Sequence, residues 1–164
     1  MKKIFLTTAL MMLVAVTFVS CNKEKVIFEE TRTFTEDKWL RQNPESFELD
    51  IKNVDDCYNI FFTMTIDTTS VRGNNFPLIV NLFSENGERR MFYSYLILRN
   101  NEGTWLAPLE GSKLKINQTI REYFFFNKEG KYRLEIGQGT DRYEVKGISS
   151  FGVKIQKAEL VYPK

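Results

Sequence analysis

The absence of histidine from this 164-residue chain limits the chemistry that its side chains can do. A Ser/His/Asp or Cys/His triad, an imidazole general base and the common histidine-bearing zinc sites are all excluded. The 21 acidic residues show neither the spacing of a calcium-binding loop nor a pair that stands out as general acid and base. We therefore expect no catalytic residue, no metal and no cofactor, and we do not expect an enzyme.

The thiol of Cys21 is the side chain with the clearest chemistry. It follows Lys2 and Lys3, an apolar run over residues 4–19 and the small residue Ser20. This order is typical of a secretory signal peptide, and the run is short for a bilayer span, which needs about 20 residues. Ser20-Cys21 resembles the bacterial lipobox, in which the thiol is acylated before cleavage. We predict a signal peptide over residues 1–20 and lipidation of Cys21; the alternative is an ordinary signal peptide with a chance cysteine.

Lipidation would place the protein on a membrane, because each buried methylene contributes about 0.8 kcal/mol. Asn22 is not the aspartate of an inner-membrane retention signal, and residues 23–25 are not the acidic run of a surface-export signal. We expect an outer-membrane protein that faces the periplasm. Loss of Lys2 and Lys3 would leave 21 basic and 21 acidic side chains, so no basic excess favours nucleic acid.

The rest of the chain alternates with period two, which predicts β-strands with one buried face. We expect a lipidated tether over residues 21–26 and one domain over residues 27–164, an antiparallel β-sandwich of immunoglobulin-like or jelly-roll-like connectivity. The predicted strands include Phe47–Ile51, Tyr58–Ile66, Leu78–Phe83, Met91–Leu98 and Phe151–Ile155. The third and fourth are apolar on both faces and are predicted to be central.

Two hairpins are predicted from turn residues. The first joins its strands through Ser84–Glu88, where Asn86-Gly87 tolerates positive φ. The second would join Leu114–Phe126 to Tyr132–Ile136 through residues 127–130.

Aromatic side chains offer the main candidates for a contact surface. Trp39 and Trp105 are candidates for binding a partner or stacking on a sugar, although core packing is the ordinary role of such residues. Alternation places Tyr93 and Tyr95 on one face of their strand, and Phe124 and Phe126 together on another. One of these sets must find cover on another sheet or on a partner.

One short motif suggests a modification. Asp67-Thr68-Thr69 resembles the Asp-Thr-X acceptor for O-glycosylation of exported Bacteroidetes proteins, which makes Thr68 a candidate site.

Several separated segments together resemble the GldH family of gliding-motility-associated lipoproteins. These are Ser20-Cys21, Trp39 followed by residues 47–51, Tyr58, Asn81-Leu82, residues 103–106 (Gly-Thr-Trp-Leu), residues 130–136 and the closing residues 147–155. Their order and spacing carry the resemblance over nearly the whole mature chain. The chain departs from the family after Trp105, where residues 107–111 replace a glycine-richer loop.

The resemblance implies a non-enzymatic outer-membrane lipoprotein associated with gliding machinery and the type IX secretion pathway of Bacteroidetes. Its partners would be the membrane, through the N-terminal lipid, and other envelope lipoproteins or secretion and motility proteins. The leading hypothesis is a membrane-anchored interaction or assembly module. The alternative is a glycan-binding envelope lipoprotein, which is distinguished by whether Trp39 and Trp105 are exposed.

Overall fold

The computed structural model describes residues 26–159, so the predicted signal peptide and Cys21 lie outside the described residues. Eight long strands build the domain: β1 (Val26–Thr33), β3 (Glu45–Ile51), β4 (Tyr58–Asp67), β5 (Asn75–Ser84), β6 (Arg89–Ile97), β8 (Lys113–Phe124), β9 (Gly130–Gln138) and β11 (Ile148–Lys157). The shorter elements are η1 (Thr35–Asp37), β2 (Lys38–Leu40), β7 (Leu109–Glu110) and β10 (Glu144–Lys146). Within residues 26–159 no helix is long and apolar enough to cross a membrane.

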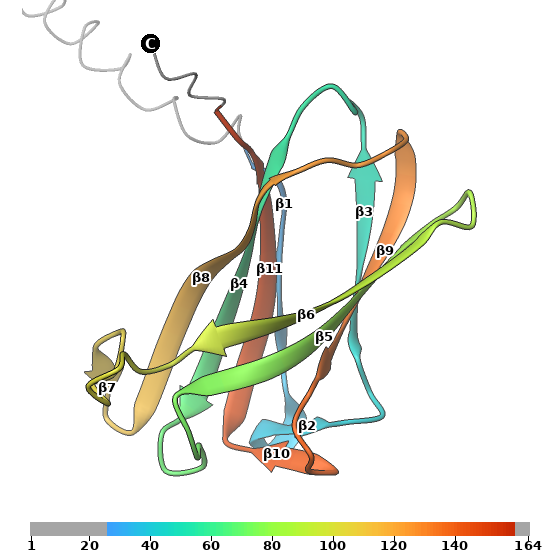
Figure 1. Ribbon diagram of the computed structural model, residues 1–164. Coiled ribbons are helices and arrows are strands. Elements are labelled where there is room, and N and C mark those ends of the chain that lie inside the picture. Colours follow the sequence, from blue (N-terminus) through green and yellow to red (C-terminus); the bar gives the residue numbers. More distant parts are fainter. Residues whose placement is uncertain (1–25, 160–164) are drawn as a thin grey trace, which may run out of the picture.

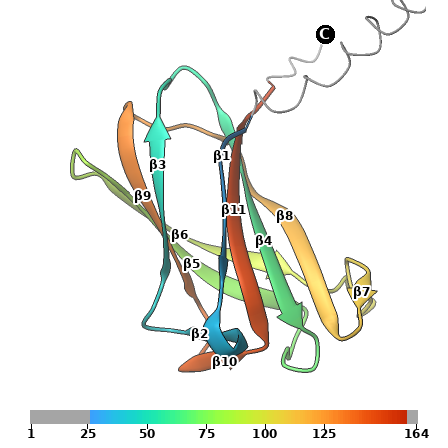
Figure 2. The ribbon, with the colours of Figure 1, turned by 180° about the vertical axis from the view of Figure 1, so that it is seen from behind.

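The strands form two antiparallel sheets that pack face to face (Figures 1 and 2). One sheet has the order β1-β11-β4-β8-β7, and the other has the order β3-β9-β5-β6. Counted along the chain, the long strands therefore run 1-8-3-6 in one sheet and 2-7-4-5 in the other. This is jelly-roll connectivity, which decides between the two sandwich types left open by the sequence. The pair β2-β10 closes one end of the sandwich.

The core lies between the sheets because alternate residues of each strand point inward. In β4 every second side chain from Tyr58 to Ile66 is buried. At the centre, the ring of Phe151 lies 5.0 Å from that of Trp39 and 5.3 Å from that of Phe62, measured between ring centroids. The ring of Phe47, on β3 of the other sheet, lies 6.4 Å from that of Phe151, so side chains of both sheets share one hydrophobic core.

Gly152, beside Phe151, shows how closely the strands of one sheet meet. A Cβ atom at this position would lie 2.5 Å from the Thr63 Oγ1 atom and 2.6 Å from the Thr31 Oγ1 atom. Thr63 and Thr31 belong to β4 and β1, the two neighbours of β11. Glycine is therefore required here by close approach rather than by backbone conformation.

Most predicted strands are confirmed. β3, β4 and β11 contain the strands expected from alternation, and β5 is central, between β9 and β6. The first hairpin is also confirmed: β5 pairs with β6, Gly87 has a φ of +80°, and the Ser84 N–H donates to the Glu88 carbonyl at 2.9 Å.

Two expectations about strand neighbours are wrong. β6 is an edge strand, not a central one, because β5 is its one neighbour in the sheet, and the apolar residues on its outer face are exposed. The second predicted hairpin does not form, since β8 pairs with β4 and β7 whereas β9 pairs with β3 and β5. Residues 125–129 therefore cross from one sheet to the other. Alternation shows which side of a strand is buried but not which strand lies beside it.

Candidate contact surface

The outer face of β6 carries a row of exposed apolar side chains. The exposed fractions are 54% for Met91, 63% for Tyr93, 53% for Tyr95 and 41% for Ile97. In the register of the sheet, Tyr93 lies opposite Ile79 and Tyr95 lies opposite Pro77, both half-buried on β5. We call these six residues the β6 face. A contiguous apolar surface of this kind is typical of a protein contact site, whereas single exposed apolar residues are not.

On the side of β9 the β6 face borders on glycine. Ile79 pairs with Gly137, where a Cβ atom would lie 3.9 Å from the Pro44 Cβ atom. The N–H of Gly139 donates to the Pro77 carbonyl at 2.8 Å, which keeps this part of the backbone against β5.

One end of β6 is fixed to β8 by a side chain. The Ile97 N–H donates to the Gln118 Oε1 atom at 2.9 Å, and the Gln118 Nε2 atom donates to the Ile97 carbonyl. The amide of Gln118 thus takes the place of a neighbouring strand at this position.

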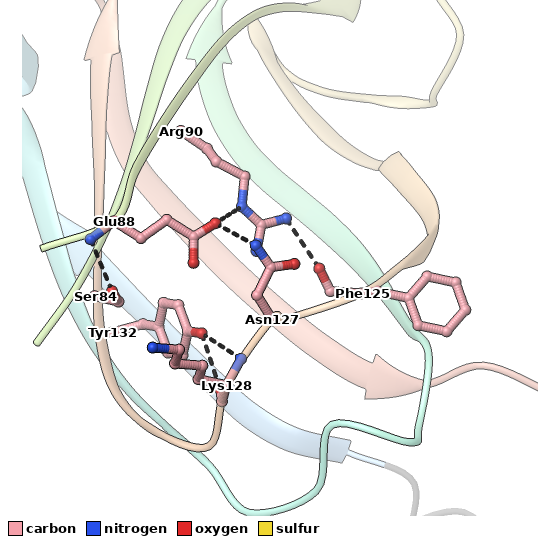
Figure 3. Close-up of polar contacts among 7 residues, drawn as sticks. All are labelled: Ser84, Glu88, Arg90, Phe125, Asn127, Lys128 and Tyr132. Carbon is pink, nitrogen blue, oxygen red and sulfur yellow. Dashed lines mark hydrogen bonds and ion pairs between the residues drawn. The ribbon is translucent and has the colours of Figure 1, made fainter. Parts of the chain in front are cut away.

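The other end of β6 is fixed by Arg90 (Figure 3). The Arg90 Nε atom lies 2.8 Å from the Glu88 Oε1 atom, and the Arg90 Nη1 atom donates to the Phe125 carbonyl at 2.9 Å. Asn127 Nδ2 donates to the same Glu88 oxygen at 2.6 Å, and the Arg90 guanidinium lies 4.8 Å from the Phe124 ring centroid. These contacts join the β5–β6 hairpin to the crossover after β8.

We expect Arg90→Ala to lower the free energy of unfolding by about 1–3 kcal/mol, because it removes a charged hydrogen bond and leaves Glu88 without its ion pair. The stability of Arg90→Lys should lie between that of Arg90→Ala and that of the unchanged protein, since one ammonium reaches fewer acceptors than a guanidinium. Urea unfolding of the purified domain measures both. Arg142→Ala, at an exposed arginine, is the control and should be nearly neutral; equal stability of Arg90→Ala and Arg142→Ala would contradict this account.

The prediction that Trp39 forms a contact surface is wrong. Its side chain is 1% exposed and packs between the rings of Phe34, Phe76 and Phe151. The indole Nε1 atom donates to the Asn43 carbonyl at 3.1 Å, which satisfies its one polar group. Trp39 is a core residue because β2 folds over the open end of the sandwich.

Trp105 is half-buried in the loop after β6. The guanidinium carbon of Arg99 lies 3.8 Å from the Trp105 ring centroid, so one face of the ring is covered. A tight turn precedes Trp105: Gly103 has a φ of +82°, and its N–H donates to the Asn100 carbonyl at 3.0 Å. At most one face and the edge of Trp105 remain for a ligand.

Thr68 lies where β4 ends, and its hydroxyl already has a partner. The Oγ1 atom donates to the Ser112 carbonyl at 2.9 Å. The hydroxyl and N–H of Thr69 and the hydroxyl of Ser112 donate to the Asp67 carboxylate, and these bonds lower the pKa of Asp67. O-glycosylation of Thr68 stays a prediction, and it would break the bond to Ser112.

A hollow of about 430 Å³ opens beside β2. Its carboxylates are Glu36, Glu45 and Glu144. The Lys38 ammonium, which donates to Glu36 at 2.5 Å, lowers the pKa of that carboxyl, whereas burial raises the pKa of Glu45. Among residues 26–159 no group of three or more His, Cys, Asp or Glu side chains is placed to hold a metal ion.

The sequence partly anticipated the β6 face. Alternation correctly placed Tyr93 and Tyr95 together on the exposed face. The other aromatic set, Phe124 and Phe126, is the one that is covered. Phe126 is 2% exposed, and its ring centroid lies 4.9 Å from that of Tyr132. Met91 and Ile97 were missed as surface residues. Their signal is the apolar pattern on both faces of this strand, which predicts burial instead of a surface.

The solved structures to which the chain is similar share little sequence with it. The Eiger TNF of S. frugiperda matches 85% of this chain and 98% of its own length at 10% identity, with a TM-score of 0.47. A structure of infectious bursal disease virus, Gx strain, matches 85% of this chain and 31% of that chain at 13% identity, with a TM-score of 0.36. Dimeric latent PorU from Porphyromonas gingivalis matches 81% of this chain and 13% of that chain at 10% identity, with a TM-score of 0.33. At these scores none of them carries an argument about function.

The comparison with curated proteins found no match. A comparison with protein families gave a different result: the family described as GldH lipoprotein matches residues 26–155, which are nearly all of the described domain. The match includes β6, the turn around Trp105 and most of β11. Because the family covers well over half of the sequence, the chain belongs to the GldH lipoprotein family, whose members are associated with gliding motility.

Proposed function

We propose that this lipoprotein is a non-catalytic interaction module, held by lipid on Cys21 at the periplasmic face of the outer membrane. Through the β6 face it docks another envelope protein of the secretion or motility machinery. Family membership supports the lipoprotein, and the exposed row of Met91, Tyr93, Tyr95 and Ile97 is the observation that supports docking. The chain contains no histidine, so an imidazole general acid or base is excluded.

The anchor and the β6 face would act together. A protein held on a membrane is confined to a thin layer, which raises its effective concentration toward neighbours without tight intrinsic affinity. Tyrosine is enriched among residues that dominate binding energy, because its large rigid ring buries area at a small entropic cost. Two exposed tyrosines on neighbouring outward positions therefore suit a moderate-affinity protein contact.

We expect Tyr93→Ser/Tyr95→Ser to lower recovery of crosslinked envelope partners by about tenfold or more, because each ring contributes on the order of 1–2 kcal/mol to a buried contact. The measurement is quantitative mass spectrometry of proteins captured from crosslinked envelopes. Tyr143→Ser is the matched control, because Tyr143 is 62% exposed and is not one of the six residues of the β6 face.

Both variants should keep the fold, since the three tyrosine side chains are exposed. Capture of the same secretion or motility partners by the double variant as by the control would refute the role of the β6 face. Capture of no such partner even by the unchanged protein would refute the docking function itself.

The glycan-binding alternative was based on the two tryptophans. Trp39 is buried and Arg99 covers one face of Trp105, so no pair of exposed indoles forms a sugar-stacking platform within the described residues. We therefore favour a protein partner.

A further inference from the structure

One end of the sandwich lies close to the predicted lipid. In the sheet register, Val26 of β1 pairs with Gln156 of β11, and Tyr58 pairs with both Lys157 and Phe124. The beginning of β1, the end of β11 and the end of β8 therefore share one end of the domain (Figure 1), which we call the anchor end. Four residues separate Cys21 from Val26, and a chain of this length reaches at most about 17 Å. Lipid on Cys21 would hold the anchor end within that distance.

Exposed apolar side chains occur at this same end. Ile27, Tyr123 and Phe125 are 37%, 48% and 50% exposed. β1 and β8 are three strand spacings apart, so these side chains span about 14 Å. Figure 3 shows that the Phe125 ring turns away from the Arg90 network that fixes its backbone. The Phe125 side chain therefore points outward, while its backbone is fixed by the hydrogen bond from Arg90.

Tyr123 is held in an unfavourable backbone conformation. Its φ of +52° is in the left-handed region, where a tyrosine is strained, and its N–H donates to the Asn59 Oδ1 atom at 3.1 Å. A strained residue that is also an exposed aromatic is more typical of a contact site than of a neutral surface.

We propose that the anchor end rests on the bilayer, with Tyr123 and Phe125 in the lipid–water interface and Ile27 beside them. Aromatic rings prefer this interface because they are apolar with, for tyrosine, one polar group that stays wet. This end carries both charge signs, for example Lys128 next to Glu129, so the contact does not depend on anionic lipid. The inference rests on the proposed anchoring at Cys21 and adds an orientation that leaves the β6 face on the side of the domain, open to a partner.

The test uses the full-length lipidated protein with an environment-sensitive dye on Lys128→Cys, next to the aromatics, or on Asp141→Cys, in an exposed loop at the other end. Cys57 is buried, so the dye reacts at the new cysteine. The protein is inserted into phosphatidylethanolamine–phosphatidylglycerol vesicles that contain nitroxide lipid, and a co-sedimentation assay shows attachment. We expect quenching of about half or more of the emission at position 128 and little at position 141.

A second variant tests the aromatics themselves. Tyr123→Ser/Phe125→Ser, with the dye still at position 128, should co-sediment as before but lose most of the quenching, and thermal unfolding checks that it folds. Equal quenching at positions 128 and 141 in attached protein would overturn the orientation alone. Failure of the unchanged protein to co-sediment would overturn the anchoring, and this inference with it.

Discussion

Replacing Cys21 by Ser is expected to remove the lipid and clear the protein from the outer membrane. A serine hydroxyl is not the thiol that is acylated, and among residues 26–159 no helix is long and apolar enough to cross a membrane in place of the acyl chains. Metabolic labelling with palmitate should fall to background, and the amount in the outer-membrane fraction should fall by at least about tenfold, because two or three acyl chains are needed for stable attachment. Since cleavage follows acylation, uncleaved precursor should accumulate.

Cys57→Ala is the matched control for this experiment. Cys57 is buried, 3% exposed, and its loss should leave lipidation and location unchanged. Palmitate incorporation that persists in Cys21→Ser, or that disappears in Cys57→Ala, would show that Cys21 is not the lipidated cysteine.

The second large effect is expected from the middle of the core. Phe151 is completely buried, and its ring contacts those of Trp39, Phe47 and Phe62. Phe151→Ala should lower the free energy of unfolding by about 3–5 kcal/mol, because it leaves a cavity that β11 and β4 cannot close. Urea unfolding and thermal melting of the purified domain measure this loss.

Phe125→Ala separates burial from residue type, because the Phe125 side chain is 50% exposed. The same truncation there should cost less than about 1 kcal/mol. If the two alanine variants were equally stable, the core described here would not be the one that holds the domain together.

The sequence predicted the parts of this fold that depend on a single strand. In β4, the alternation from Tyr58 to Ile66 required one buried face, and the structure buries each of these positions. The turn at Asn86-Gly87 needed a residue that adopts positive φ, and this local requirement identified the β5–β6 hairpin. Local patterns of this kind are decided by neighbours in the sequence.

The features of the fold that the sequence did not predict depend on contacts between segments that are distant in the sequence. Nothing local shows that residues 125–129 cross between sheets, because the partner strands of β8 and β9 lie far away in the sequence. The same limit applies to the candidate site: β6 looks buried from its apolar pattern, yet it lies at an edge and its outer face has no cover. Trp39 is the reverse case, an aromatic in a polar segment that the closing strand β2 carries into the core.

Site-specific photo-crosslinking in intact cells tests most directly whether the domain is a membrane-anchored contact module. A photoreactive phenylalanine at position 93 samples the β6 face, and one at Glu48 samples the opposite edge of the same sheet. We expect position 93, but not position 48, to give a discrete crosslinked product with an envelope protein, and Cys21→Ser to abolish it. Products of equal yield from both positions, or a product at position 93 that persists without the lipid, would contradict a membrane-anchored contact module.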